Sequence, residues 1–444
     1  MSKFTCAYIP IGVPTFHIDS AREEYQKSVK VLSEITENLV YPDDMLLQIS
    51  DLKDFINSIK ADVVILQNVT FANSAFCAQV LKSTDCPILL WTLREPVIDG
   101  NRLRLNSLTG AYSAAIIMYE LGRPFEYIFG GPEEKEVKEK LKAVISAAEI
   151  KHSFKSLTIA SMGDTPQGFG FGRALDSDIL KYFGSSLINI EVRELMNKAR
   201  SYSTEECTAY FEHADSRMIG LENVPKNNLD GFIRLYKAYS EFVQENNIGA
   251  LASRCWPDFF TEYGTPVCSV LAMLNDSKIA ASCEGDVYGA LSMYVGTKLT
   301  DSPVYFGDPV SLDEEENTLT FWHCGTAACS LAKNNKAEVG VHPNRKMGPT
   351  MAFGCKPGKN AVIFRKKKKN DGTFRLFIAE GEILDKPKQF SGTSLVVKTK
   401  NNVKDIVSSS IKMGFEPHYA VIYGDVAAEL EILGRMMDFE VYLF

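Results

Sequence analysis

The chain of 444 residues has no apolar run approaching the roughly 20 residues that a membrane span requires. Its first residues, MSKFTCAYIPIGVPTF, do not combine a basic segment with a long apolar stretch and a small-residue cleavage site. We therefore expect no membrane partner and no secretory signal, and we predict a cytoplasmic protein.

The cysteine spacing and the net negative charge argue against two further classes, structural zinc proteins and nucleic-acid-binding proteins. The ten cysteines include no CxxC pair, which argues against structural zinc and favours reduced thiols. The formal net charge of -8 argues against nucleic acid as a partner. One basic run, residues 365–369, lies beside an Asn370-Asp371-Gly372 turn without interleaved aromatic residues, so we interpret it as a solvated loop tip.

A chain of this length is too long for one hydrophobic core, so two or three domains are expected. Up to about residue 150, continuous apolar runs alternate with helical patterns, including a helix over 19–38 that begins at Asp19. A second alternating series follows, and its predicted strands include 156–160, 187–190, 248–252 and 279–283. Runs of this kind are typical of parallel strands with both faces covered.

Beyond residue 300 the pattern changes to short alternating segments separated by turns, such as 360–365 and 374–379. This predicts antiparallel pairing. The sequence therefore predicts an α/β protein with two Rossmann-like doubly wound domains, 1–150 and 151–300, and a β-rich, barrel-like domain over 301–444.

Two carboxylates, Glu284 and Asp286, flank Gly285 directly after the apolar strand 279–283 and before an apolar helix. Open α/β sheets bind ligands at the carboxyl ends of their strands. Such a pair suits a divalent cation or proton transfer on a bound substrate. The alternative is a helix N-terminus that carries acids only because the helix dipole favours them.

The sequence contains only six histidines, and two of them lie near predicted strand ends. His323 ends the segment TFWH, and His418 directly precedes the last apolar stretch. Each could be an ordinary buried histidine. Together with Glu284 and Asp286, they form a candidate oxygen and nitrogen ligand set that suits Mn²⁺, with Co²⁺ or Mg²⁺ as alternatives.

Other segments are candidates for substrate binding. They include Arg254 and Trp256 after a buried strand, His17 after the first strand, Gln167 in a glycine-rich loop, and Arg345 and Lys346 in a turn-rich loop. The glycine-rich loop 162–173 does not have the GxGxxG spacing of a dinucleotide site, and Pro166 interrupts it. Both loops could also be plain surface loops.

Several of these motifs together resemble the L-fucose/L-arabinose isomerase family. They are CEGDVYGA at 283–290, WHCG at 322–325, PHY at 417–419 with Gly424-Asp425, GDTPQGF at 163–169 and VREL at 192–195. The resemblance implies two Rossmann-like domains and a β-rich domain. It also implies an aldose–ketose isomerase with a divalent metal, usually Mn²⁺, near a subunit boundary, and hence a homo-oligomer, from dimer to hexamer.

Carried over by position, the resemblance makes Asp286 and His418 metal ligands. The other acidic ligand of the family falls at or near Cys268, which suggests that Glu284, His323 or water replaces it. Glu284 or Asp286 would then move a proton between C2 and C1 of an open-chain sugar through a cis-enediol.

The cations Arg254, Arg345 and Lys346 would allow an acidic sugar such as sulfoquinovose, which short members of the family isomerise. A neutral pentose or deoxyhexose of the L-fucose, L-arabinose or D-arabinose type is the alternative substrate. Two other classes stay open: a non-catalytic sugar-binding protein, and a lyase or epimerase with related enediolate chemistry.

Overall fold

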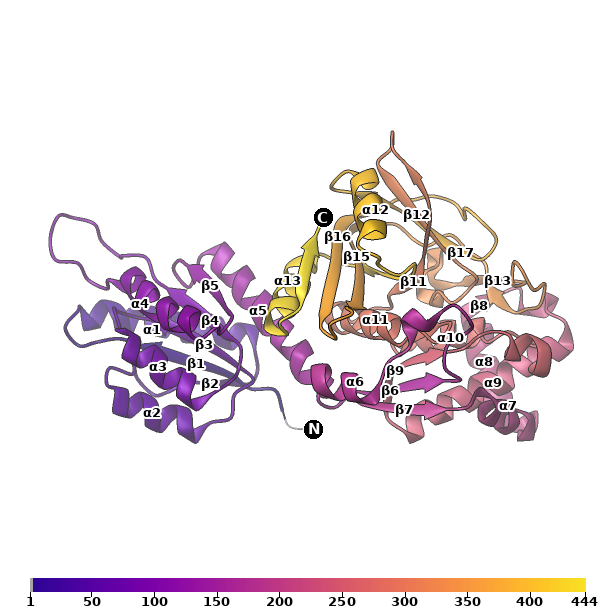
Figure 1. The fold of residues 1–444 in the computed structure, drawn as a ribbon, viewed down its shortest axis with the longest axis horizontal. Coiled ribbons are helices and arrows are strands. Elements are labelled where there is room, and N and C mark those ends of the chain that lie inside the picture. Colours follow the sequence, from indigo (N-terminus) through magenta and orange to yellow (C-terminus); the bar gives the residue numbers. More distant parts are fainter. Residues whose placement is uncertain (1–2) are drawn as a thin grey trace. The chain divides into compact units, whose positions relative to one another are not determined.

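The computed structural model describes residues 3–444 (Figure 1). The chain forms two compact units. Unit 1 comprises the chain up to Ser153 together with Ala428–Asp438, and unit 2 comprises Phe154–Ala427 and Phe439–Phe444. Each unit has its own sheets, so each is described by itself.

Unit 1 is built on a five-stranded parallel sheet with the order β2-β1-β3-β4-β5. The strands are β1 (Cys6–Ile11), β2 (Leu39–Val40), β3 (Val63–Asn68), β4 (Ile88–Thr92) and β5 (Phe125–Phe129). Strands β1, β3 and β4 are buried throughout, as the continuous apolar runs in the sequence predict.

Helices cover this sheet. They are α1 (Ile18–Ile35), α2 (Ile49–Ser58), α3 (Ser74–Ser83), α4 (Ser107–Glu120) and α5 (Lys135–Phe154), with α13 (Ala427–Met436) largely in the same unit. Alternate residues of β1, such as Ala7 and Ile9, pack in one core with α2, α3 and α4. Helix α1 begins one residue earlier than the sequence predicted, and its N-cap is His17 rather than Asp19, because the His17 ring accepts the amide of Ser20.

Unit 2 contains a four-stranded parallel sheet with the order β10-β9-β6-β7. Its strands are β6 (Thr158–Met162), β7 (Ser186–Ile190), β9 (Ile248–Ser253) and β10 (Ala280–Cys283). The helices of this unit are α6 (Asp176–Phe183), α7 (Val192–Ser201), α8 (Thr208–Arg217), α9 (Lys226–Glu245), α10 (Cys268–Asp276), α11 (Val287–Thr300) and α12 (Val403–Lys412).

A seven-stranded sheet completes unit 2, with the order β15-β18-β11-β12-β17-β16-β19. The strands are β11 (Tyr305–Asp313), β12 (Thr318–His323), β15 (Gly358–Lys368), β16 (Phe374–Ile383), β17 (Thr393–Thr399), β18 (Tyr419–Tyr423) and β19 (Glu440–Leu443). Because β15 also pairs with β16, six antiparallel strands close into a ring, and β19 adds to β16 in parallel.

Shorter elements connect these sheets. A small sheet joins β8 (Met218–Ile219), β13 (Ala337–Gly340) and β14 (Thr350–Met351). Single turns of helix lie at Gly170–Gly172, Glu205–Cys207, Leu221–Asn223, Phe259–Tyr263, Cys329–Leu331 and Lys333–Asn335. Within residues 3–444, no helix is both long enough and apolar enough to cross a membrane.

The predicted mixed α/β class, with parallel sheets and a β-rich C-terminal part, is confirmed. The interpretation of residues 365–369 as a solvated loop tip is wrong at its first two positions. Arg365 and Lys366 are 0% and 1% exposed, because they belong to β15 and not to the turn that follows it.

Candidate active site

The Glu284-Gly285-Asp286 turn joins the end of β10 to the start of α11. Asp286 is the N-cap of α11, where its Oδ1 accepts the amide of Gly289 at 2.8 Å. Glu284 and Gly285 both have positive φ, which fits the tight turn. A side chain at Gly285 would meet the carbonyl oxygen of Asp164 at 2.3 Å, so the glycine-rich loop packs directly on this turn.

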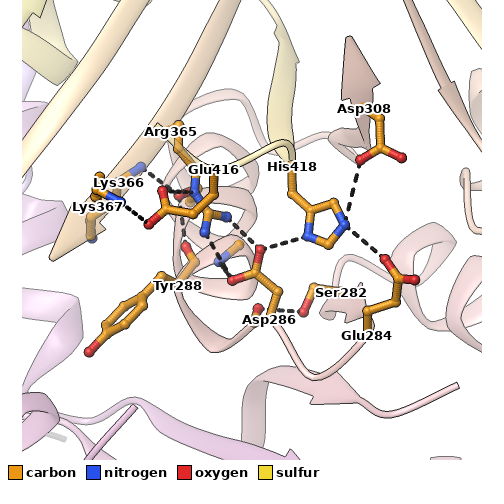
Figure 2. Close-up of polar contacts among 12 residues, drawn as sticks. Ser282, Glu284, Asp286, Tyr288, Asp308, Arg365, Lys366, Lys367, Glu416 and His418 are labelled. Carbon is orange, nitrogen blue, oxygen red and sulfur yellow. Dashed lines mark hydrogen bonds and ion pairs between the residues drawn. The ribbon is translucent and has the colours of Figure 1, made fainter. Parts of the chain in front are cut away.

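His418 is held between the two carboxylates, directly before β18 (Figure 2). Its Nδ1 lies 2.9 Å from Asp286 Oδ2, and its Nε2 lies 2.9 Å from Glu284 Oε2. The ring is 1% exposed. These contacts bring together three of the four metal-ligand candidates that the sequence suggested, and the fourth, His323, lies within 4.8 Å of Glu284 and His418.

A third carboxylate, Asp308 on β11, was not identified from the sequence. Gly307 pairs with Tyr419 and Asp308 pairs with Trp322, so the barrel register places Asp308 beside both His418 and His323. Asp308 Oδ1 lies 3.5 Å from His418 Nε2, and this buried oxygen makes no hydrogen bond. Such an atom normally has a partner, so its surroundings suit a cation or a proton.

Arg365 on β15 neutralises the buried Asp286. Its Nη1 and Nη2 donate to the two oxygens of Asp286 at 2.6 and 3.1 Å, and both side chains are fully buried. Glu416 accepts from Arg365 Nε at 3.3 Å and from Lys367 Nζ at 2.7 Å (Figure 2). Arg365 and Glu416 thus lie on one side of Asp286, and His418 lies on the other side (Figure 2).

His323 ends β12, and its Nδ1 contacts a thiol and a hydroxyl group. That nitrogen lies 3.4 Å from Cys324 Sγ and 3.3 Å from Thr326 Oγ1. One atom each of Glu284, His323 and His418 lie within 4.8 Å of one another. Nδ1 of each histidine has a partner that fixes the orientation of the ring. Nε2 of His418 contacts Glu284 and Asp308, so a cation at this nitrogen would replace those contacts.

The charge of these groups follows from their neighbours. Burial alone would lower the pKa of His418, but hydrogen bonds and attraction from Asp286 and Glu284 raise it to about 10. Burial works against ionised Asp286, yet Arg365 and His418 hold its pKa well below the usual range. Burial raises the pKa of Asp308, and His418 and His323 offset this only in part.

An aromatic wall lies beside the carboxylates. Trp256 Nε1 donates to Glu284 Oε1 at 3.1 Å, which supports the predicted position of Trp256 in the site. Phe169 and Phe171, from the glycine-rich loop, lie with ring centroids 6.1 and 5.5 Å from that of His418. Gln167 is exposed in the same loop.

The predicted substrate-binding cations differ in their partners. Arg254 is paired with Asp258 at 2.8 Å. Arg345 lies 6.0 Å from the ring of Trp256 and 5.7 Å from that of Phe260, and within residues 3–444 no carboxylate pairs with it. Lys346 is exposed beside it. His17 belongs to unit 1, where it caps α1, and is not among the residues gathered here.

The residues of unit 2 fit a divalent cation. Glu284, His323 and His418 supply one oxygen and two nitrogens, and the unbonded oxygen of Asp308 faces the same histidine. Mixed carboxylate and imidazole sets of this kind suit first-row divalent ions.

Known proteins resemble this chain over its whole length. Residues 322–444 match the family described as L-fucose isomerase, C-terminal domain. The chain is 59% identical over 446 residues to the sulfoquinovose isomerase of Clostridium sp. (strain MSTE9), with 100% of both chains covered. It is 36% identical to that of Priestia megaterium, again over 100% of both, and 35% identical to that of Alkalicoccus urumqiensis, over 98% of both.

The chain therefore belongs to the L-fucose isomerase-like family of aldose–ketose isomerases, which includes these sulfoquinovose isomerases. The family and the enzyme class that the sequence predicted are thereby confirmed.

Proposed function

We propose that this enzyme isomerises sulfoquinovose to sulfofructose in the cytoplasm with the help of Mn²⁺. The observation that carries the proposal is the convergence of Glu284, Asp308, His323 and His418 at the end of the β10 strand and the rim of the barrel. The full-length identity of 59% to a sulfoquinovose isomerase supports the choice of substrate.

Glu284, His323 and His418 would hold the cation, with Co²⁺ or Mg²⁺ as alternatives to Mn²⁺. When bound, a divalent cation supplies Lewis-acid polarisation of the sugar carbonyl. Trp256 would hold the carboxylate of Glu284 in place through its 3.1 Å hydrogen bond.

Asp308 is the carboxylate best placed to move the proton between C2 and C1 through a cis-enediol. Its Oδ1 has no hydrogen bond, and burial raises its pKa above the ordinary value, so it holds a proton more readily than an exposed aspartate does. Its side chain is 28% exposed, which leaves it open to a substrate. Glu284, 17% exposed, is the second carboxylate that a substrate can reach.

Asp286 would act differently from the ligand and base role that the sequence suggested. Its side chain is 0% exposed, and Arg365 and His418 occupy its oxygens. We propose that Asp286 positions His418: it fixes Nδ1 and so directs Nε2 toward the cation.

Arg345 is the residue that would recognise the sulfonate. It is exposed, has no carboxylate partner within residues 3–444, and lies over Trp256, which itself contacts Glu284. Arg254 is already paired with an acid, so it would support the pocket rather than bind an anion. Lys346 and Gln167 would contribute at the rim, whereas the proposed substrate role of His17 has no support within its own unit.

The test measures ketose formation by the Mn²⁺-loaded enzyme from sulfoquinovose and from neutral aldoses such as L-fucose and D-arabinose. We expect sulfoquinovose to be the preferred substrate and a chelator to abolish turnover. Arg345→Met should raise KM for sulfoquinovose by roughly tenfold or more, since it removes one charge-assisted contact.

Arg22→Met is the control, because Arg22 is an exposed arginine of unit 1 that is paired with Asp44 at 3.1 Å. Its KM should stay close to that of the parent enzyme. A preference for a neutral sugar would refute the proposed substrate, and full activity after chelation would refute the role of the metal.

A further inference from the structure

Four cysteines lie behind the proposed active site, and the mechanism above does not use them. Cys268 opens α10, Cys283 ends β10, Cys255 follows β9, and Cys324 follows His323. All four are buried, and none takes part in a disulfide. Cys324 contacts Cys268 and Cys283, and Cys283 contacts Cys255, so the four thiols form one buried cluster.

Two of these thiols and one histidine have the spacing of metal ligands. Cys268 Sγ and Cys324 Sγ are 3.8 Å apart, and both lie within 4.8 Å of a ring nitrogen of His342. Two sulfurs bound to one tetrahedral zinc at about 2.3 Å each are separated by about 3.8 Å. The two thiols thus already have the separation that such an ion requires.

The ring of His342 is held in place by its own loop and by Phe260. Its Nδ1 lies 3.3 Å from the amides of Asn344 and Arg345, and its ring packs edge-on to Phe260 at 5.0 Å. Ligation through Nε2 would move the ring proton to Nδ1 and give up these two long contacts. The ring is 7% exposed, so its surroundings would otherwise keep it in place.

We propose that Cys268, Cys324 and His342 form a second cation site, specific for a soft divalent ion such as Zn²⁺ or Cd²⁺. Its sulfur and nitrogen donors differ from the carboxylate and imidazole donors of the first site, so the two sites select different metals. Binding of a cation at this second site does not depend on the proposed isomerase activity.

The two sites would be linked through Cys324. Cys324 Sγ lies 3.4 Å from His323 Nδ1, so a cation bound to this sulfur takes away one of the two partners that orient His323 and leaves only Thr326. This contact predicts that Zn²⁺ or Cd²⁺ inhibits the Mn²⁺-loaded enzyme, and this second prediction rests on the proposed function.

The test titrates the full-length, metal-free protein with CdCl₂ and follows the ultraviolet absorbance of cadmium–thiolate bonds. We expect one equivalent of Cd²⁺ to produce this absorbance, ZnCl₂ to displace it, and MnCl₂ at the same concentration to leave it unchanged. Cys268→Ser should weaken Cd²⁺ binding by more than about 100-fold, since losing an outer-shell partner alone costs 10–100-fold.

Cys355→Ser is the matched control, because Cys355 is a buried thiol outside this group. His342→Gln serves as a second variant: it keeps both thiols and should show weaker binding, with the thiolate absorbance retained at saturating Cd²⁺. Circular dichroism confirms that each variant is folded. An absence of thiolate absorbance in the parent protein, or equal absorbance in Cys268→Ser, would overturn the proposal.

Discussion

Two histidines of the site are oriented in the same way by chemically different partners. Asp286 contacts Nδ1 of His418 at 2.9 Å, and Cys324 contacts Nδ1 of His323 at 3.4 Å. A partner at Nδ1 fixes the orientation of each ring and therefore the position of its Nε2, which is how neighbours of metal-ligating histidines act. A carboxylate holds its histidine more strongly than a thiol does, so we expect His418 to be the better fixed of the two.

Asp308 and Glu284 have separable roles, and two substitutions should distinguish them. Asp308→Asn removes the proposed base, so kcat should fall by roughly 10²–10⁴-fold while Mn²⁺ affinity changes little. Glu284→Gln removes a ligand oxygen, so Mn²⁺ affinity itself should fall. Isothermal titration with MnCl₂ alongside steady-state kinetics makes the comparison, and an inverted pattern would reverse the two assignments.

Asp286 should matter for stability as well as for activity. Asp286→Asn leaves the buried guanidinium of Arg365 without its main counter-charge, which is expected to cost about 3–5 kcal/mol in the free energy of unfolding. Urea denaturation measures this. The control Asp44→Asn breaks an exposed pair with Arg22 and should cost less than about 1 kcal/mol. Equal effects would show that the Asp286 pair is not important for stability.

The sequence predicted part of this site. Glu284, Asp286 and His418 could be found because a strand, a turn and a helix cap leave a local pattern. Asp308 could not, because only the barrel register places it beside His418. Arg365 was misinterpreted because a run of five cations resembles a solvated turn, and the acids that neutralise it, Asp286 and Glu416, are distant in sequence.

Strand β15 shows how a single element can bury two adjacent cations. Successive side chains of a strand point to opposite faces, and here Arg365 meets Asp286 while Lys366 meets the rings of Phe154 and Phe183 at 4.9 and 4.4 Å. Lys366 Nζ makes no hydrogen bond, and burial lowers its pKa to about 7. The aromatic faces partly compensate for the lost water.

Lys366→Met should stabilise the protein in a pH-dependent way. Between pH 7 and the ordinary value of 10.5, the unfolded chain holds a proton that the native Lys366 lacks, so native stability rises with pH. Below pH 7 the native state carries the buried charge, so the substitution should gain about 1–4 kcal/mol at pH 6 and less at pH 9.

Urea denaturation at the two pH values measures this gain. Lys398→Met, an exposed lysine on β17 of the same sheet, should change stability by less than about 0.5 kcal/mol at either pH. A loss of stability in Lys366→Met at pH 6 would mean that the cation–aromatic contacts outweigh desolvation.

The helices and strands were easier to predict from the sequence than the residues of the site. Strands such as β3 and β4 were found within two residues of their ends because they are continuous apolar runs. The β15–β16 hairpin was found from its turn and alternation. The small β8, β13 and β14 sheet was missed, because its strands are two to four residues long and are held by distant partners. The three-domain division remains a prediction.

At the scale of the whole molecule, helix α4 of unit 1 presents an apolar stripe to solvent. Leu108, Tyr112, Ile116 and Tyr119 are 43%, 75%, 51% and 79% exposed, and their spacing places them on one helical face. Exposed apolar stripes of this kind mark interaction surfaces. We propose that the stripe contributes to the homo-oligomer expected from the family resemblance.

Tyr112→Glu combined with Tyr119→Glu should therefore reduce the molar mass in solution, because two charges cannot be buried unpaired in an interface. Size-exclusion chromatography with light scattering measures this. Glu120→Gln, at the end of the same helix, is the control and should leave the mass unchanged. An unchanged assembly in the double variant would exclude the stripe from the interface.

The hydrogen bond from His418 to Glu284 spans 134 residues of sequence. During synthesis, Glu284 is therefore made well before its partner His418. A nascent chain therefore has the proposed cation site only in part until His418 has been made. Tight metal uptake would then mark a completed and correctly closed barrel, so the metal content of a preparation would report how much of the enzyme has matured.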